Sequence, residues 1–267
     1  MVHIVINVEY WVFEAEMPRK VLTAPHGLEQ VPDIPNYSWA EYGMRCGMPR
    51  LLQCLTERQL PASVSLNAGV IEAYPSLVRA MLDAGWEFIG HGLHQKSIQG
   101  ENQEEDVIAK SLDLIERFTG ARPRGWLGPG LKETLETPDI LKKLGIKYVY
   151  DWVLDDLPCW MDTRHGALLS LPYTLELNDS VIYAVEKHAS PEMSRRLSDT
   201  LSVFEKEVSE QPRVLTLGLH PHLIGVPHRF FYLQKMLDLL ISRGDTHFVT
   251  GQEIAKWYEA VCPPPEN

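Results

Sequence analysis

The sequence contains several short apolar segments that each run into a titratable residue. Three of them are the runs Val2–Val8, Trp86–Ile89 and Val214–Leu219. Uninterrupted apolar runs of this length are typical of strands buried on both faces, as in parallel sheets. The C-terminal ends of parallel strands meet at one edge, so residues that follow such strands share a crevice. We therefore predict that Glu9, His91 and His220, which follow these runs, form one site. For any one of them alone, a polar residue marking a strand end is the simpler interpretation.

Strand-like and helix-like patterns alternate about seven times along the chain. Further strands are expected at Pro61–Leu66, Pro123–Leu127, Lys147–Tyr150, Leu168–Leu171, Ser180–Tyr183 and His247–Thr250. Helices are expected at Trp39–Leu55, Pro75–Ala84, Glu101–Thr119, Thr137–Leu144, Pro191–Ser209, Arg229–Ser242 and Gln252–Val261. We see no composition shift or internal repeat that divides the chain. This order predicts one α/β domain spanning residues 1–267, closed or nearly closed as a barrel.

Charge and cysteine content exclude several classes of protein. The formal net charge is −11, and there is no basic run of the kind that binds nucleic acid. No apolar stretch approaches the roughly 18 residues that span a membrane. The cysteines do not form C-x-x-C or zinc-finger spacings; they are Cys46, Cys54, Cys159 and Cys262. With no signal-peptide pattern at the N-terminus, we expect a cytoplasmic protein that binds neither nucleic acid nor membranes.

Residues Trp11–Pro35, between the first strand and the first helix, show no clear period and contain several prolines. We expect this segment to lie on the surface. A loop of this length in a compact domain is often functional.

The order of these motifs resembles the polysaccharide deacetylase superfamily, and most closely its metal-independent allantoinases and bacterial cyclic-imide hydrolases. The resemblance covers nearly the whole chain. It is carried by Asn7-Val8-Glu9, Glu41-Tyr42-Gly43-Met44-Arg45, Gly90-His91-Gly92, Gly125-Trp126, Asp155-Asp156-Leu157-Pro158, Leu171-Pro172-Tyr173-Thr174-Leu175, Asn178-Asp179, Gly218-Leu219-His220 and Leu223-Ile224-Gly225. The resemblance implies a distorted (β/α) barrel of about seven parallel strands. It also implies hydrolysis of carbon–nitrogen bonds other than peptide bonds, a small-molecule substrate, and a homo-oligomer, either a dimer or a tetramer.

The metal-ligand positions of the family are altered in this sequence. Polysaccharide deacetylases begin with a Thr-Phe-Asp-Asp motif, whose first acid is the general base and whose second is a metal ligand. Here Glu9 occupies the base position and Tyr10 the metal position. The second ligand histidine, four residues after His91, is replaced by Gln95, and the third-motif arginine falls on Leu127.

These replacements change the set of residues that could bind a catalytic metal ion. Catalytic zinc usually has three protein ligands drawn from His, Asp, Glu and Cys. The resemblance therefore implies that no cofactor is bound. The alternative is a zinc ion held by Glu9, His91 and His94.

Amide hydrolysis needs an activated water, a polarised carbonyl and a proton for the leaving nitrogen. We assign Glu9 as general base and His220 as general acid, because imidazole titrates near neutrality. His91 would orient the water or stabilise the tetrahedral oxyanion. The Gly128-Pro129-Gly130 turn either offers backbone N–H groups to the same oxyanion or is a plain strand-to-helix connection.

Further residues are predicted to contact the substrate: Asn7, Tyr42, Arg45, His94, Trp126, Gly128, Asp155 and His222. The aromatic side chains of Tyr42, Trp126 and Trp152 would form a slot for a flat ring, whose polar edge Arg45 and Asp155 would bind. Core packing is the alternative for the aromatic residues and is favoured for Trp152. A structural salt bridge is the alternative for Arg45, and a surface-loop position is the alternative for His222.

A site without a metal suits a reactive ring better than an acyclic acetamide, which benefits from a Lewis acid. We therefore expect a hydrolase that opens cyclic amides, with cyclic imides first and allantoin close behind. The short third motif Trp126–Pro129 favours the imides. Two alternatives stay open: a metal-dependent deacetylase of an N-acetylated sugar, and a non-catalytic ligand-binding protein. Retention of both Glu9 and His220 argues against the second.

Overall fold

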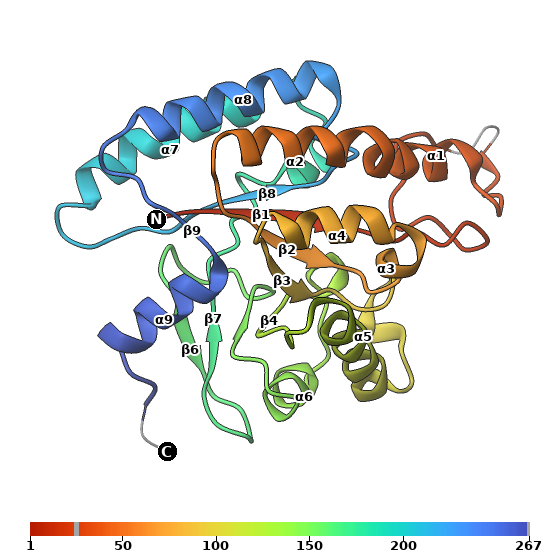
Figure 1. Cartoon of the computed structure of the whole chain (residues 1–267), viewed down its shortest axis with the longest axis horizontal. Coiled ribbons are helices and arrows are strands. Elements are labelled where there is room, and N and C mark those ends of the chain that lie inside the picture. Colours follow the sequence, from red (N-terminus) through yellow and green to blue (C-terminus); the bar gives the residue numbers. More distant parts are fainter. Residues whose placement is uncertain (24–26, 266–267) are drawn as a thin grey trace.

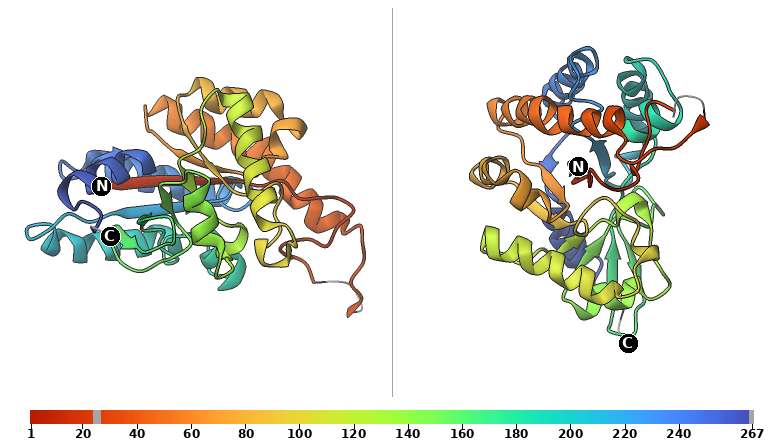
Figure 2. Two further views of the ribbon diagram at one scale, coloured as in Figure 1. Left: turned by 90° about the horizontal axis from the view of Figure 1, so that it is seen from below. Right: turned by 90° about the vertical axis from the view of Figure 1, so that its right-hand side faces the viewer.

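A computed structural model describes residues 1–23 and 27–265 of the chain. Within these residues the strands form a nine-stranded sheet in the order β6-β7-β5-β4-β3-β2-β1-β8, with β9 paired to β1 (Figure 1). The strands are β1 (Val2–Val8), β2 (Ser63–Leu66), β3 (Glu87–Gly90), β4 (Gly125–Trp126), β5 (Tyr148–Val149), β6 (Cys159–Met161), β7 (Leu168–Ser170), β8 (Leu215–Leu219) and β9 (Phe248–Val249). Only the β6–β7 pair is antiparallel among the pairs in these described ranges. The sheet curls into a partial barrel, which confirms the predicted fold class (Figure 2).

Helices cover the outside of the curled sheet (Figure 2). The α-helices are α1 (Ile34–Tyr42), α2 (Met48–Glu57), α3 (Val70–Ala73), α4 (Pro75–Asp83), α5 (Glu104–Thr119), α6 (Thr137–Lys143), α7 (Glu192–Glu207), α8 (Pro227–Ser242) and α9 (Gly251–Val261). Shorter helical turns are η2 (Gly43–Gly47), η3 (Ile98–Gly100), η4 (Pro129–Leu131) and η5 (Val181–Val185). Their apolar positions follow the helical period: in α8 the buried residues are Leu233, Met236, Leu237 and Leu240. No helix in the described ranges is both long and apolar enough to cross a membrane.

The expected elements are present apart from a few differences. The prediction of a strand at Ser180–Tyr183 is wrong: the chain forms the helical turn η5 there, because the Asn178 side chain accepts the Ser180 N–H and starts a turn. A short apolar run does not separate a strand from a buried helical turn. Strand β6 and helix α3 were not predicted. The helix expected at Trp39–Leu55 is the continuous unit α1–η2–α2, whose middle turn is π-helical.

Helical turn η2 packs backbone to backbone against the loop after β8. A Cβ added at Gly43 would lie 2.6 Å from His222 Cβ. At Gly47 it would lie 2.0 Å from the Pro221 carbonyl oxygen, and at Gly225 it would lie 2.3 Å from the same oxygen. Glycine is required here because no side chain fits between the two segments. The contact fixes the loop that begins at His220.

A buried polar network closes the opposite end of the sheet, where the strands begin. The Glu87 carboxylate accepts the N–H groups of Gly251 at 2.9 Å and Gln252 at 3.0 Å, at the start of α9. It also accepts the hydroxyls of Ser63 and Tyr148. Burial raises the pKa of Glu87. This network joins three strands to the last helix.

Candidate active site

The structure brings Glu9, His91 and His220 to one inner cavity of about 160 Å³. Strands β1 and β8 are parallel neighbours with Ile6 opposite Leu219, so the residues that follow them emerge at the same edge. His91 follows β3, which is separated from β1 by β2 and lies on the side of β1 opposite β8. Helical turn η4 and the segments before and within η5 contribute to the wall of the cavity.

The carboxylate of Glu9 lies between an indole and an imidazole. Its Oε2 accepts the Trp11 Nε1–H at 2.7 Å. Its Oε1 lies 3.6 Å from His220 Nε2. The Glu9 and His220 side chains are both largely buried. A carboxylate and an imidazole are thus placed side by side, within reach of one bound molecule.

His220 is held by the buried carboxylate of Asp179. The Nδ1–H of His220 donates to Asp179 Oδ1 at 2.6 Å. The other oxygen of Asp179 accepts the backbone N–H groups of His220 at 2.7 Å and Ile224 at 3.1 Å. The imidazole therefore presents Nε2 to Glu9, and the carboxylate stabilises it when it is protonated.

His91 is neutral near pH 7. Its Nδ1 is hydrogen-bonded to the Leu127 carbonyl, which can only accept, so Nδ1 carries the proton. Its Nε2 is buried and makes no hydrogen bond within the described residues. Burial lowers the pKa of His91 to about 4, more than the Leu127 carbonyl raises it. Nε2 therefore offers a lone pair, which accepts a hydrogen bond from water.

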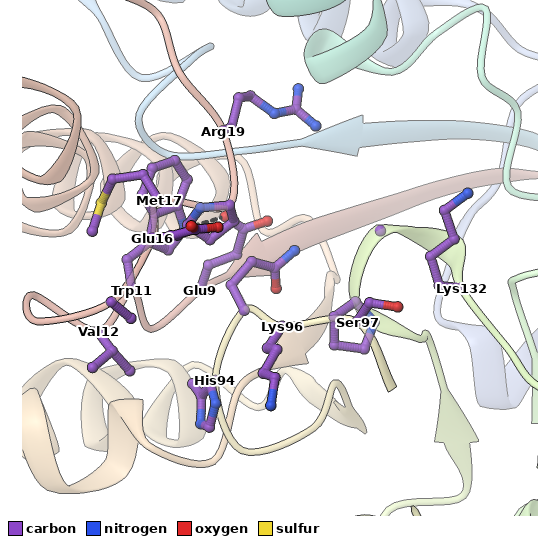
Figure 3. Close-up of a pocket in the computed structure, with 15 residues that line it drawn as sticks. Glu9, Trp11, Val12, Glu16, Met17, Arg19, His94, Lys96, Ser97 and Lys132 are labelled. Atoms are coloured by element: carbon purple, nitrogen blue, oxygen red, sulfur yellow. Dashed lines mark hydrogen bonds between the residues drawn. The ribbon is translucent and has the colours of Figure 1, made fainter. Parts of the chain in front are cut away.

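A larger outer cleft of about 450 Å³ adjoins the inner cavity (Figure 3). The segment 11–19 forms one side of it and the segment 94–97 another, so the long loop after β1 does contribute to the site. The basic residues Arg19, Lys96 and Lys132 line this cleft. Arg19 is oriented by Ser180, whose carbonyl oxygen accepts its Nη1–H at 3.2 Å, and also lines the inner cavity.

The donor set does not fit the zinc site of the family. Among the described residues there is no group of three His, Cys, Asp or Glu side chains that could hold a metal ion. His94 lines the outer cleft and not the inner cavity that His91 lines. The Tyr10 ring packs against Gly69, where an added Cβ would lie 2.7 Å from its Cδ1.

Three predicted substrate contacts are occupied by other interactions. Trp126 is fully buried and packs in the core beneath α5, so it does not form a slot. His222 is also buried, not on a surface loop, and its ring lies edge-on to Trp39 at 4.6 Å. The Gly128 N–H donates to both oxygens of Asp151, at 2.8 and 3.0 Å, and is not free for an oxyanion.

Three more predicted contacts lie outside both cavities. The Tyr42 hydroxyl accepts an N–H of Arg50 at 2.9 Å. Arg45 is exposed and forms no salt bridge in the part of the chain described. Asp155 lines a separate cleft.

Trp152 is 40% exposed and its Nε1–H donates to Glu133, so the core position favoured for it is wrong. Asn7 does line the inner cavity.

Several side chains at or beside the inner cavity were not assigned a role from the sequence. Asp179 and Tyr173 belong to the motifs that carry the resemblance, but no role was assigned to them. Burial and then the neighbouring Glu133 raise the pKa of Asp151, whose carboxylate accepts the Gly128 N–H. Arg19 could have been found only from the rule that long loops after strands reach the site.

Comparison with known proteins identifies the family. Residues 37–149 match the family model for polysaccharide deacetylase. A Schizosaccharomyces pombe protein named "Putative polysaccharide deacetylase" is 30% identical over 243 residues, 84% of this chain and 76% of that protein. The chain therefore belongs to the polysaccharide deacetylase family.

Two solved structures share nearly the whole fold. "Probable Polysaccharide deacetylase from Pseudomonas aeruginosa PAO1" has a TM-score of 0.87 and 27% identity, with 99% of this chain and 92% of that chain covered. A structure named "Puue Allantoinase" has a TM-score of 0.87 and 25% identity, with 99% and 91% covered. These similarities place the chain among hydrolases of carbon–nitrogen bonds.

Proposed function

We propose that this protein opens small cyclic amides, with cyclic imides as the best substrates and allantoin-like ureides next. The pairing of Glu9 with an Asp179-supported His220 at the inner cavity carries this proposal. The cavity of about 160 Å³ suits a single small ring. It is smaller than the about 300–1,000 Å³ of sites for drug-sized ligands. The similarity to an allantoinase over nearly the whole chain supports the same substrate class.

The attack on the ring begins at Glu9. Its carboxylate takes a proton from a water molecule as the water oxygen bonds to the ring carbonyl carbon. Neutral His91 accepts the second hydrogen of this water at Nε2 and so orients it. The C=O electron pair moves onto the carbonyl oxygen and forms a tetrahedral oxyanion.

Collapse of this intermediate opens the ring. The C–N bond breaks, and protonated His220 donates from Nε2 to the departing nitrogen. Asp179 stabilises the imidazolium before the transfer. An imide ring thus gives a chain with a carboxylate at one end and an amide at the other. An imide nitrogen leaves more readily than a simple amine, which suits a site that lacks a metal-ligand set.

A substrate panel tests the proposal. Succinimide, hydantoin, allantoin and an N-acetylated chitooligosaccharide are each incubated with the purified protein, with and without a chelator, and products are quantified. We expect ring opening of the imide that persists in the chelator and falls about 10²-fold or more in Glu9→Gln. Release of acetate from the oligosaccharide without ring opening would replace this proposal with sugar deacetylation.

A further inference from the structure

We propose that the Tyr173 hydroxyl is the donor that stabilises the oxyanion. The inference deepens the proposed function, on which it rests for the imide substrate. Its chemistry requires only that an amide carbonyl is attacked in the inner cavity, because every such attack places negative charge on the carbonyl oxygen. Tyr173 follows β7 and lines the inner cavity together with Glu9, His91 and His220.

Two amide groups donate to the Tyr173 oxygen. Asn7 Nδ2 lies 2.8 Å from it, and Asn178 Nδ2 lies 3.2 Å from it. A phenolic oxygen has one proton to donate and can accept hydrogen bonds. With two donors already directed at the oxygen, its proton must point in another direction.

The orientation of both amides is fixed by independent contacts. Asn7 Nδ2 also donates to the Leu219 carbonyl at 3.3 Å, which only an N–H can do. Asn178 Oδ1 accepts the Ser180 N–H at 2.9 Å, which places its Nδ2 toward Tyr173. Exchanging oxygen and nitrogen in either amide would set two acceptors or two donors against each other.

The inner cavity is where the free proton finds an acceptor. No described carbonyl or carboxylate accepts it, and the Tyr173 side chain is buried away from solvent. Burial also raises the pKa of Tyr173, so the hydroxyl keeps its proton. Two other candidates are excluded: the Gly128 N–H is bound to Asp151, and His91 Nε2 is an acceptor.

The test compares Tyr173→Phe with Tyr150→Phe as the matched control. Tyr150 is buried, its ring centroid lies 6.1 Å from that of Tyr173, and its hydroxyl makes no hydrogen bond in the described structure. It does not line the inner cavity. We expect Tyr173→Phe to lower kcat about 10²-fold with KM changed only a few-fold. The loss should be the same for all leaving nitrogens in a substrate series, because the oxyanion forms in every case. Tyr150→Phe should retain kcat.

A second variant guards against a folding defect. Replacing Tyr173 with 3-fluorotyrosine keeps the ring and the hydroxyl and should retain kcat within about 10-fold, while Tyr173→Phe does not. A Tyr173→Phe protein that keeps kcat within about threefold, or a loss matched by Tyr150→Phe, would overturn the assignment. If the wild type hydrolyses only the N-acetylated sugar, the proposed substrate is wrong, and the same variants test Tyr173 on that amide. If it hydrolyses no amide, both proposals fail.

Discussion

At the scale of single residues, Asp179 keeps a proton on Nδ1 of His220 and so decides which tautomer the imidazole adopts. Its Oδ2 accepts two backbone N–H groups, so in an Asp179→Asn variant the amide oxygen would stay there and the NH2 group would turn toward His220 Nδ1. That exchange forces the neutral tautomer with its proton on Nε2 and removes the stabilisation of the imidazolium. We predict that Asp179→Asn lowers kcat about 10²-fold or more while the fold is retained, as steady-state kinetics and circular dichroism would show.

Asp155→Asn is the matched control for this variant, because Asp155 is exposed and lines a separate cleft. Its kinetic constants should equal those of the wild type. A loss of activity in Asp155→Asn would restore the predicted role of Asp155 at the substrate. Normal turnover in Asp179→Asn would show that His220 is not the acid.

The second prediction at this scale concerns metal. His91 Nε2 offers one lone pair that could bind a metal, and a single ligand does not hold zinc tightly. We predict substoichiometric zinc in the purified protein and full ring-opening activity after dialysis against a chelator. Gln95 lines both cavities, so Gln95→His should raise zinc occupancy, measured by elemental analysis. Stoichiometric zinc with activity lost to chelator and regained with added metal would contradict this.

At the scale of elements, the packing of η2 against the loop after β8 decides where His220 lies. A methyl group at Gly47 would overlap the Pro221 carbonyl at 2.0 Å, so the two segments must separate. We predict that Gly47→Ala lowers the free energy of unfolding by several kcal/mol, of the order of the largest single-substitution effects, and lowers kcat in the folded fraction. Urea titration and kinetics measure both quantities.

Gly100→Ala is the control for this substitution, since an added Cβ there meets nothing within 4 Å. It should change the unfolding free energy by less than about 1 kcal/mol. Equal stability of the two variants would show that the loop adapts to the methyl group.

The residues that follow the strands of the site could be predicted from the sequence, whereas the side chains that support them could not. Glu9, His91 and His220 follow buried strands, and one rule of parallel sheets brings them together. Asp179 and Tyr173 lie in irregular segments whose position depends on contacts across the fold, such as the 41-residue separation between Asp179 and His220. Trp126 was misplaced because a strand of two residues does not reveal which face meets the cavity.

At the scale of the whole molecule, buried histidines make stability depend on pH. Burial lowers the pKa of His3 to about 3 and that of His91 to about 4, and it also lowers the pKa of His222. The folded state therefore binds fewer protons than the unfolded state below the ordinary histidine value of 6.5. The stability that these groups contribute is present above that value and is lost as pH falls toward 4 and 3.

Buried carboxyls act in the opposite direction. The pKa values of Glu87, Asp151 and Glu133 are raised, so their contribution is present below the ordinary carboxyl pKa and is lost as pH rises through the raised values. Because the carboxyls and the histidines change stability in opposite directions, the pH dependence of unfolding is best measured for one residue at a time. His3→Phe keeps a ring against Tyr150, with which His3 stacks at 5.6 Å, and removes the titration.

We predict that the free energy of unfolding of the wild type, relative to His3→Phe, falls between pH 6.5 and pH 5 by up to about 1.4 kcal/mol per pH unit. Urea unfolding at several pH values measures this difference. Parallel curves for the two proteins would show that His3 is not held neutral in the folded state.

The Glu87 network has a consequence for the order in which the protein is made. Glu87 lies in the first half of the chain, yet two of its four donors are the N–H groups of residues 251 and 252. Until the ribosome has added those residues, a sheet assembled from β1 to β5 could bury this carboxylate only with half its donors missing. Such a state is costly. The nascent domain should thus stay open at this end through most of translation and close only when α9 docks.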